Sequence, residues 1–313
     1  MGKQHTTPAV PAVDLYAQIT SRILADLEQG VRPWVTPWTT GAGNGRVTRP
    51  LRATGEPYTG INVLLLWMEA VTAGHQSPTW MTYKQAQALG GQVKRGEKGS
   101  PIVYYGTTTA RQDRAESAGA GDDAREVRFL KTYTVFNVAQ IEGLPERFRP
   151  EPVEEAPALP AFDRLAEVDG WFEAIGATVA HGGAEAFYMP GEDRIQLPPP
   201  EAFRDAHGYY TTRAHETVHW TRHPSRLDRR FGRERWGDEG YAREELVAEL
   251  GAAFLAADLG LALEPCADHA DYLAHWTNVL QNDKRAIVSA AAHAERAVIY
   301  LHAITGAERG ETA

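Results

Sequence analysis

The stretch His215-Glu216-Thr217-Val218-His219 lies in a run of helical periodicity over residues 209–221. Residues four apart on a helix share one face, so both imidazoles are predicted to point to the same side. Two such histidines can bind one metal ion while the glutamate between them faces a bound water. Two surface histidines are the alternative, but this composition makes a chance H-E-x-x-H rare. Neutral imidazoles suit Zn²⁺, and we expect one zinc ion per chain.

A third ligand is expected from the next helix, because a catalytic zinc has three protein ligands and one open position. Arg222 and Ser225 stand where a metzincin has its glycine and its third histidine. Glu245 fits a glutamate-ligand zincin instead, and the adjacent Glu244 is its rival. Glu249 lies one turn after Glu245 and could hold a ligand histidine through the other ring N–H.

The chemistry expected of this site is hydrolysis. Glu216 is the predicted catalytic residue, which accepts the proton of the metal-bound water. A donor to the developing oxyanion is also required, and Tyr241 and His223 are both candidates. A hairpin whose second strand is residues 194–197 precedes the motif, as expected for an edge strand that pairs with an extended peptide substrate.

The fold class is predicted to be α+β, with a small α+β domain followed by a mainly helical domain that contains a small antiparallel sheet. Apolar periodicity predicts helices over residues 14–29, 61–73, 82–89, 161–175, 209–221, 241–259, 267–281 and 284–304. Strands are predicted over residues 102–105, 128–136, 187–189 and 194–197. The polar segment 107–126 is predicted to be a surface loop between two of these strands.

A segment rich in proline and glutamate, residues 144–160, divides the sequence. Such composition favours an extended linker, and 313 residues suit about two domains. We therefore predict one domain over residues 1–145, a linker over 146–160 and a second domain over 161–313.

The net charge of −9 excludes a uniformly basic protein but hides an asymmetry. Residues 1–145 contain 15 basic and 12 acidic side chains, whereas the remainder contains 17 and 29. The single cysteine, Cys266, excludes an internal disulfide and a cysteine-rich zinc module, so we expect a reducing, cytoplasmic environment. The most apolar run, residues 63–68, is far shorter than the ~18 residues that span a bilayer, so no membrane partner is expected.

Basic and aromatic residues alternate in the first half of the chain. A groove of cations with aromatic rings that stack on bases is typical of single-stranded nucleic acid binding. Tryptophans that belong to the core and solvated loop arginines are the alternative. The candidate contacts are Trp34, Trp38, Arg46, Arg49, Arg52, Tyr83, Lys84, Lys94, Arg95 and Lys98.

Four segments of the first half resemble the N-terminal domain of ArdC-type antirestriction proteins, which also begins the TraC-type primases of conjugative plasmids. They are ITSRILADLEQGVRPWVTPW (19–38), GEPYTGINVLLLW (55–67), WMTYKQAQALGGQVKRGEKGSPIVYY (80–105) and TYTVFNVAQIEGLP (132–145). HETVHWTRHPSRLDR (215–229) and YAREELVAELGAAFLAADLGL (241–261) are similar to the zincin-like metallopeptidase domain of the same proteins.

The resemblance implies sequence-independent binding of single-stranded DNA by the first domain and protection of incoming plasmid DNA from restriction. It also implies a thermolysin-like zinc site with His215, His219 and Glu245 as ligands and Glu216 as catalytic glutamate. Two other functions stay open. The chain could be a zinc-dependent peptidase whose first domain recognises a protein substrate, or a non-catalytic DNA-binding protein with a structural zinc.

Overall fold

The computed structural model describes residues 14–34, 48–110, 125–148, 165–232, 238–261 and 270–306. The predicted DNA contacts Trp38 and Arg46, together with Cys266, lie outside these residues. So do residues 149–160 of the predicted linker and residues 111–124 of the predicted surface loop.

The first half of the chain contains three helices where periodicity predicts them: α1 (Leu15–Glu28), α2 (Ile61–Ala73) and α3 (Tyr83–Ala88). Asp14 caps α1, because its side chain accepts the backbone N–H of Ala17 at 3.2 Å. Thr82 and Gln85 form a reciprocal capping box that begins α3.

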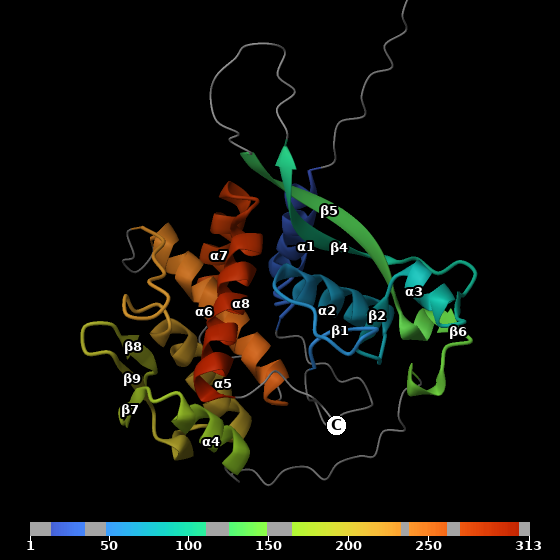
Figure 1. The fold of residues 1–313 in the computed structure, drawn as a ribbon. Helices are drawn as coiled ribbons and strands as arrows, with labels where there is room; N and C mark the ends of the chain where they lie inside the picture. Colours follow the sequence, from blue (N-terminus) through green and yellow to red (C-terminus); the bar gives the residue numbers. More distant parts are fainter. Residues whose placement is uncertain are drawn as a thin grey trace, which may run out of the picture.

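A four-stranded sheet with the order β1-β2-β5-β4 accompanies these helices. Its strands are β1 (Leu51–Arg52), β2 (Thr79–Met81), β4 (Ser100–Ala110) and β5 (Arg125–Asn137). β4 and β5 form a long antiparallel ribbon (Figure 1), so both ends of the predicted 107–126 loop belong to strands. A separate pair joins β3 (Gln92–Val93) to β6 (Ile141–Glu142), and short 3-10 turns cover Val138–Gln140 and Glu146–Phe148.

The second half is mainly helical, as predicted. Its helices are α4 (Ala166–Ala174), α5 (Ala206–Trp220), α6 (Glu239–Asp258), α7 (Ala270–Asn282) and α8 (Ala286–Thr305), with a 3-10 turn at Pro200–Ala202. α6 is buried along almost its whole length, between α5 and α8. A helix in this position can carry polar side chains only if they have partners.

The small sheet of this half differs from the prediction. Its strands are β7 (Thr178–His181), β8 (Phe187–Met189) and β9 (Arg194–Leu197), in the order β7-β9-β8. β7 runs parallel to β9 and β8 antiparallel to it, so the sheet is mixed rather than antiparallel. The predicted edge strand 194–197 is therefore central, because β7, a short strand without a clear alternating pattern, pairs with its other side.

The two halves share one hydrophobic core. Ile23 of α1, Leu64 of α2, Phe254 of α6 and Val298 of α8 belong to a single buried cluster. α1 packs on α7 and α2 on α8, and Figure 1 shows these helices side by side. The predicted division into domains stays a prediction, but the described halves are packed against each other.

A buried ion-pair network crosses the same interface. The Arg49 guanidinium donates two hydrogen bonds to Asp258, at 2.8 and 3.0 Å, and a third to Glu295 at 2.9 Å. The backbone N–H of Gly60 also donates to Glu295. These carboxylates lie on α6 and α8, so Arg49 binds the first half directly to the helices that support the candidate site.

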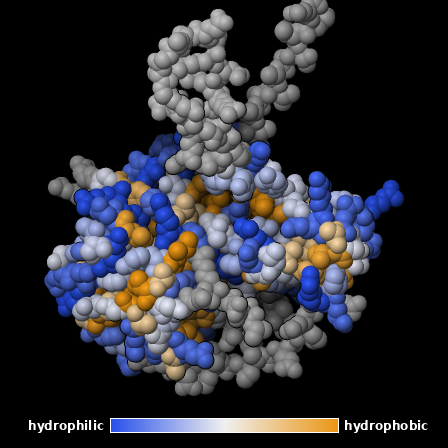
Figure 2. Space-filling model, in the orientation of Figure 1, coloured by the Kyte–Doolittle hydropathy of each residue, from blue (hydrophilic) through white to orange (hydrophobic). Residues whose placement is uncertain are grey.

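The face of the molecule drawn in Figure 2 shows hydrophobic colours as scattered patches among hydrophilic side chains. Among the helices that the structure describes, none is both long enough and apolar enough to cross a membrane.

Candidate functional site

Helix α5 places the two histidines of the motif on one face, as predicted. Asp205 caps the N-terminus of this helix, because its side chain accepts the backbone N–H of Gly208 at 2.9 Å. His215 and His219 follow one turn apart, and both are buried. Their Nε2 atoms are 3.1 Å apart, and their ring centroids 4.8 Å.

Helix α6 brings Glu245 to these histidines. Its carboxylate oxygens lie 3.3 Å from His215 Nε2 and 3.5 Å from His219 Nε2. Gly251 permits the close approach of α5, because a Cβ at this position would lie 2.7 Å from Cγ2 of Val218. The chain thus gathers one carboxylate and two imidazoles from two helices.

The three groups fit a metal ion. Their ligand atoms all lie within 4.8 Å of one another. In a tetrahedral zinc site with bonds of 2.0–2.1 Å, neighbouring ligand atoms stand roughly 3.3 Å apart. The separation of the two Nε2 atoms, 3.1 Å, is of this size, and each Nε2 lies at a similar distance, 3.3 or 3.5 Å, from a different oxygen of Glu245. Two imidazole Nε2 atoms that face each other at 3.1 Å also need a shared cation or proton between them.

The electrostatics of the cluster favour a cation. Burial lowers the pKa of His219, but Glu245 and Glu244 outweigh burial and raise it to about 9. His215 shows the same balance, since burial is outweighed by Glu245 and Glu249 and its pKa lies well above the ordinary value. Carboxylates that retain protons on histidines also attract a metal ion, which would displace those protons.

Glu216 lies beside the three predicted ligands. It is buried, and the backbone of Tyr188 is near enough to lower the pKa of its carboxyl slightly. Burial raises the pKa of Glu216, while the neighbouring histidines oppose that rise. A carboxylate with a raised pKa is suited to accept a proton near neutral pH and to return it.

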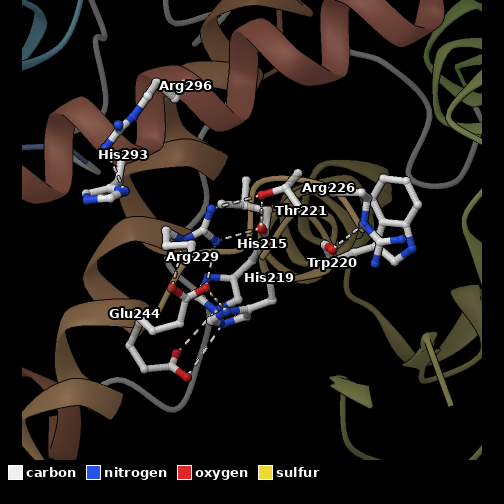
Figure 3. A network of polar contacts seen from close by, with 11 residues as sticks. His215, His219, Trp220, Thr221, Arg226, Arg229, Glu244, His293 and Arg296 are labelled. Carbon is white, nitrogen blue, oxygen red and sulfur yellow. Dashed lines mark hydrogen bonds and ion pairs between the residues drawn. The ribbon is translucent and has the colours of Figure 1, made fainter. Parts of the chain in front are cut away.

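The rival glutamate, Glu244, has a different position from Glu245. Its Oε1 lies 3.1 Å from His219 Nδ1, on the side of the ring away from the other ligands. Arg229 donates to both oxygens of Glu244, at 2.8 and 2.7 Å, and also to Thr221 and the carbonyl of Val218 (Figure 3). Glu244 therefore orients His219. Arg229, which holds Glu244 in place, was not among the predicted site residues.

Glu249 lies beside the other histidine. Its Oε2 is 3.6 Å from His215 Nδ1, within ion-pair distance but longer than a hydrogen bond. Glu249 thus faces the ring nitrogen of His215 that is opposite the nitrogen facing Glu245, and its role in holding a ligand histidine stays a prediction.

The candidate oxyanion donors stay predictions. His223 is half-buried, and its Nδ1 lies 2.8 Å from the Ser225 hydroxyl. Tyr241 is half-buried on α6, one turn before Glu245. Arg226, whose backbone N–H donates to the His223 carbonyl, contacts Tyr188 and Asp193 and stacks over Trp220, and thereby fixes strand β8 to the end of α5.

The predicted DNA contacts divide into two groups. The prediction that Arg49 and Trp34 contact DNA was wrong, because their side chains are only 4% and 1% exposed. Arg49 pairs with Asp258 and Glu295, and Trp34 packs against Trp276. Six others are exposed to solvent: Arg52, Tyr83, Lys84, Lys94, Arg95 and Lys98. All six lie from the end of β1, where Arg52 is the last residue, to the start of β4. Their partners, such as Glu56 for Arg52 and the Ala139 carbonyl for Lys94, leave them at the surface.

Comparisons with known proteins agree with this architecture. Residues 13–136 match the family described as the N-terminal domain of anti-restriction factor ArdC, and residues 166–293 match the zincin-like metallopeptidase family. The chain is 37% identical to protein y4eC of Sinorhizobium fredii, over 95% of this chain and 94% of that protein. It is 39% identical to a DNA primase TraC of Escherichia coli over 90% of this chain, which corresponds to 26% of the primase.

Solved structures give the same result. The metal-free crystal structure of the antirestriction ArdC protein from plasmid R388 is 40% identical and superposes with a TM-score of 0.78, over 94% of this chain and 98% of that one. The Mn(II)-bound structure of that protein gives a TM-score of 0.75, at 40% identity, over 93% and 98%. Because the similarity covers both halves in the same order, the chain belongs to the ArdC-type antirestriction family.

Proposed function

We propose that this chain holds a divalent metal ion, Zn²⁺, on His215, His219 and Glu245, and binds single-stranded DNA independently of sequence through its first half. Both properties would serve antirestriction in the cytoplasm. The observation that carries the proposal is the convergence of three buried ligand atoms from α5 and α6 on one point. The Mn(II)-bound structure of the R388 protein supports a divalent cation in this family.

The residues around the ligands suit metal-assisted hydrolysis. A bound zinc ion supplies Lewis acidity, which lowers the pKa of a water molecule and polarises a carbonyl. Glu216 accepts a proton at its carboxylate, and its raised pKa suits that role. Glu244 orients the imidazole of His219, which leaves Nε2 of that ring directed at Glu245.

The DNA part of the proposal rests on surface chemistry and on the primase relatives. Lys94, Arg95 and Lys98 are exposed cations on one short segment, with Tyr83 exposed nearby in sequence. Tyr104 and Tyr133, on β4 and β5, add two half-exposed rings 6.0 Å apart. Cations paired with accessible rings favour the backbone and bases of a single strand.

Two measurements on the full-length protein test the proposal. Elemental analysis should find one zinc per chain, and His215→Ala should lose it. Affinity for a single-stranded oligonucleotide should fall with salt, and replacement of Lys94, Arg95 and Lys98 by alanine should reduce the slope of log affinity against log salt by about 2. Arg204→Ala with Arg230→Ala, two exposed cations of the second half, is the control. A metal-free wild type, or a slope equal in all variants, contradicts the corresponding half of the proposal.

A second candidate function is a metal-dependent peptidase whose first half recognises a protein. One feature favours it: the backbone of Tyr188, on strand β8, lies close enough to Glu216 to influence the pKa of that carboxyl. Among the described strands β8 pairs with β9 alone, which leaves an edge where an extended peptide could add. Cleavage of a partner by wild type, lost in Glu216→Gln while zinc is retained, would support this function. Antirestriction that survives Glu216→Gln would instead favour a structural metal.

A further inference from the structure

Glu249 lies between the candidate metal site and the first half of the chain. Its Oε2 faces Nδ1 of His215 at 3.6 Å. Its Oε1 accepts two hydrogen bonds from residues more than 200 positions away in the sequence: Nη1 of Arg32 at 3.0 Å and the indole Nε1–H of Trp34 at 3.3 Å. One oxygen of this carboxylate thus faces the candidate metal site, and the other is bound by the first half of the chain.

Both donors are fixed by packing. Trp34 is 1% exposed, and its ring meets that of Trp276 on α7 edge to face at 5.8 Å. The Arg32 side chain is 11% exposed and that of Glu249 is 7% exposed. A buried carboxylate requires such donors, and two of them on Oε1 restrict its rotation so that Oε2 stays directed at His215.

The two candidate ligand histidines are supported in parallel ways. His219 is oriented by Glu244, and Glu244 is held by Arg229, both from the second half. His215 faces Glu249, and Glu249 is held by Arg32 and Trp34, both from the first half. Carboxylates behind ligand histidines fix the ring and increase its basicity.

We propose that Arg32 and Trp34 are positioning residues of the metal site: through Glu249 they orient His215, so the site is complete only when the first half of the chain is docked. This inference rests on the proposed metal binding by His215, His219 and Glu245. It assigns to the antirestriction N-terminal region a part in the metal centre, in addition to contact with DNA.

The test is the affinity of the full-length metal-free protein for Zn²⁺ alone, measured by competition with a chromophoric chelator. Trp34→Phe keeps a ring in the pocket but removes the N–H donor, and Arg32→Gln removes the charge. Each should weaken zinc binding by about tenfold. Arg32→Lys should restore part of the loss. The matched control is Trp67→Phe, because Trp67 is equally buried but donates its indole N–H to the Thr48 carbonyl.

A double-mutant cycle separates positioning from general loss of stability. In a Glu249→Gln background, Trp34→Phe and Arg32→Gln should have little further effect on zinc affinity, because they act through that carboxylate. If the wild type binds zinc and both single variants bind it with the same affinity, the inference is overturned and the proposed metal site stays intact. Effects that add fully to those of Glu249→Gln also overturn it. A wild type that binds no zinc overturns the proposed metal site itself.

Discussion

Glu244 and Glu245 are adjacent on α6 but have different tasks. Glu245 converges with both histidines on one point, whereas Glu244 contacts the far side of the His219 ring and pairs with Arg229. We predict that Glu245→Gln, which removes a ligand charge, weakens zinc binding by more than about a hundredfold. Glu244→Gln should weaken it by about tenfold to a hundredfold. Competition titrations with Zn²⁺ measure both.

Cobalt substitution provides the control for this pair. The absorption spectrum of bound Co²⁺ should change in Glu245→Gln, because a ligand is lost, and stay similar to wild type in Glu244→Gln. If Glu244→Gln has the larger effect on both affinity and spectrum, the assignment of ligand and supporting residue must be exchanged.

Arg229 is predicted to matter for stability more than any exposed arginine near it. Burial raises the pKa of Glu244, but Arg229 and His219 outweigh burial and lower it to about 2. The pair therefore stabilises the fold above pH 4.5, the ordinary value for this carboxyl, and that contribution is lost as pH falls toward 2. Arg229→Met should cost about 3–5 kcal/mol at neutral pH, because it leaves a buried charge unpaired.

Urea unfolding of the metal-free protein measures this loss. The neighbouring Arg230 pairs with Asp228 at the surface, so Arg230→Met should change the free energy of unfolding by less than about 1 kcal/mol. Equal effects of the two substitutions would contradict the role given to the buried pair.

At the scale of elements, the distance between α5 and α6 sets the geometry of the site. Gly251→Ala would place a Cβ 2.7 Å from Cγ2 and 2.9 Å from Cγ1 of Val218, a stiff side chain with little room to move. The helices must separate, and we predict a loss of about 1–3 kcal/mol together with weaker zinc binding. Val218→Ala should restore much of both in the double variant. Urea unfolding and zinc titration of the four proteins check this, and additive losses would exclude the contact as the cause.

The helices could be predicted from sequence far better than the strands. Long amphipathic segments such as 14–29 repeat their apolar residues often enough to identify a buried face. The strands β1, β3 and β7 contain two to four residues each, too few for an alternating pattern. The central position of β9 depends on pairing with β7, and nothing within residues 194–197 encodes that partner.

At the scale of the whole molecule, the site could be predicted where its residues are close together in the sequence, and not where partners come from distant parts of the chain. The spacing of His215 and His219 fixes their common face, whereas adjacent glutamates on α6 point in directions set by how that helix packs. Arg49 and Trp34 were assigned to a DNA surface because basic and aromatic residues alternate in the sequence around them. Their partners, Asp258 and Glu249, lie more than 200 residues away.

The docking of the two halves can be tested with Arg49 and Arg52, which were both predicted to contact single-stranded DNA. Arg49→Gln leaves Asp258 and Glu295 buried without their guanidinium and should cost about 3–5 kcal/mol. Burial raises the pKa of Asp258, but Arg49 and His302 together outweigh burial and the pKa lies below its ordinary value. The stabilisation should therefore be lost as the solution is acidified below about pH 4. Arg52 is half-exposed beside Glu56, so Arg52→Gln should lower the free energy of unfolding by less than about 1 kcal/mol.

The same two variants distinguish docking from contact with DNA. Arg52→Gln should weaken binding of a single-stranded oligonucleotide at low salt without a change in unfolding, because it removes one exposed cation. Arg49→Gln should destabilise the fold but leave the affinity for the oligonucleotide unchanged at temperatures where the variant is folded. Because docking of the first half also brings Arg32 and Trp34 to Glu249, Arg49→Gln should lower zinc affinity as well, whereas Arg52→Gln should not. If both arginines affect DNA binding equally and neither affects zinc, the shared core does not couple the two functions.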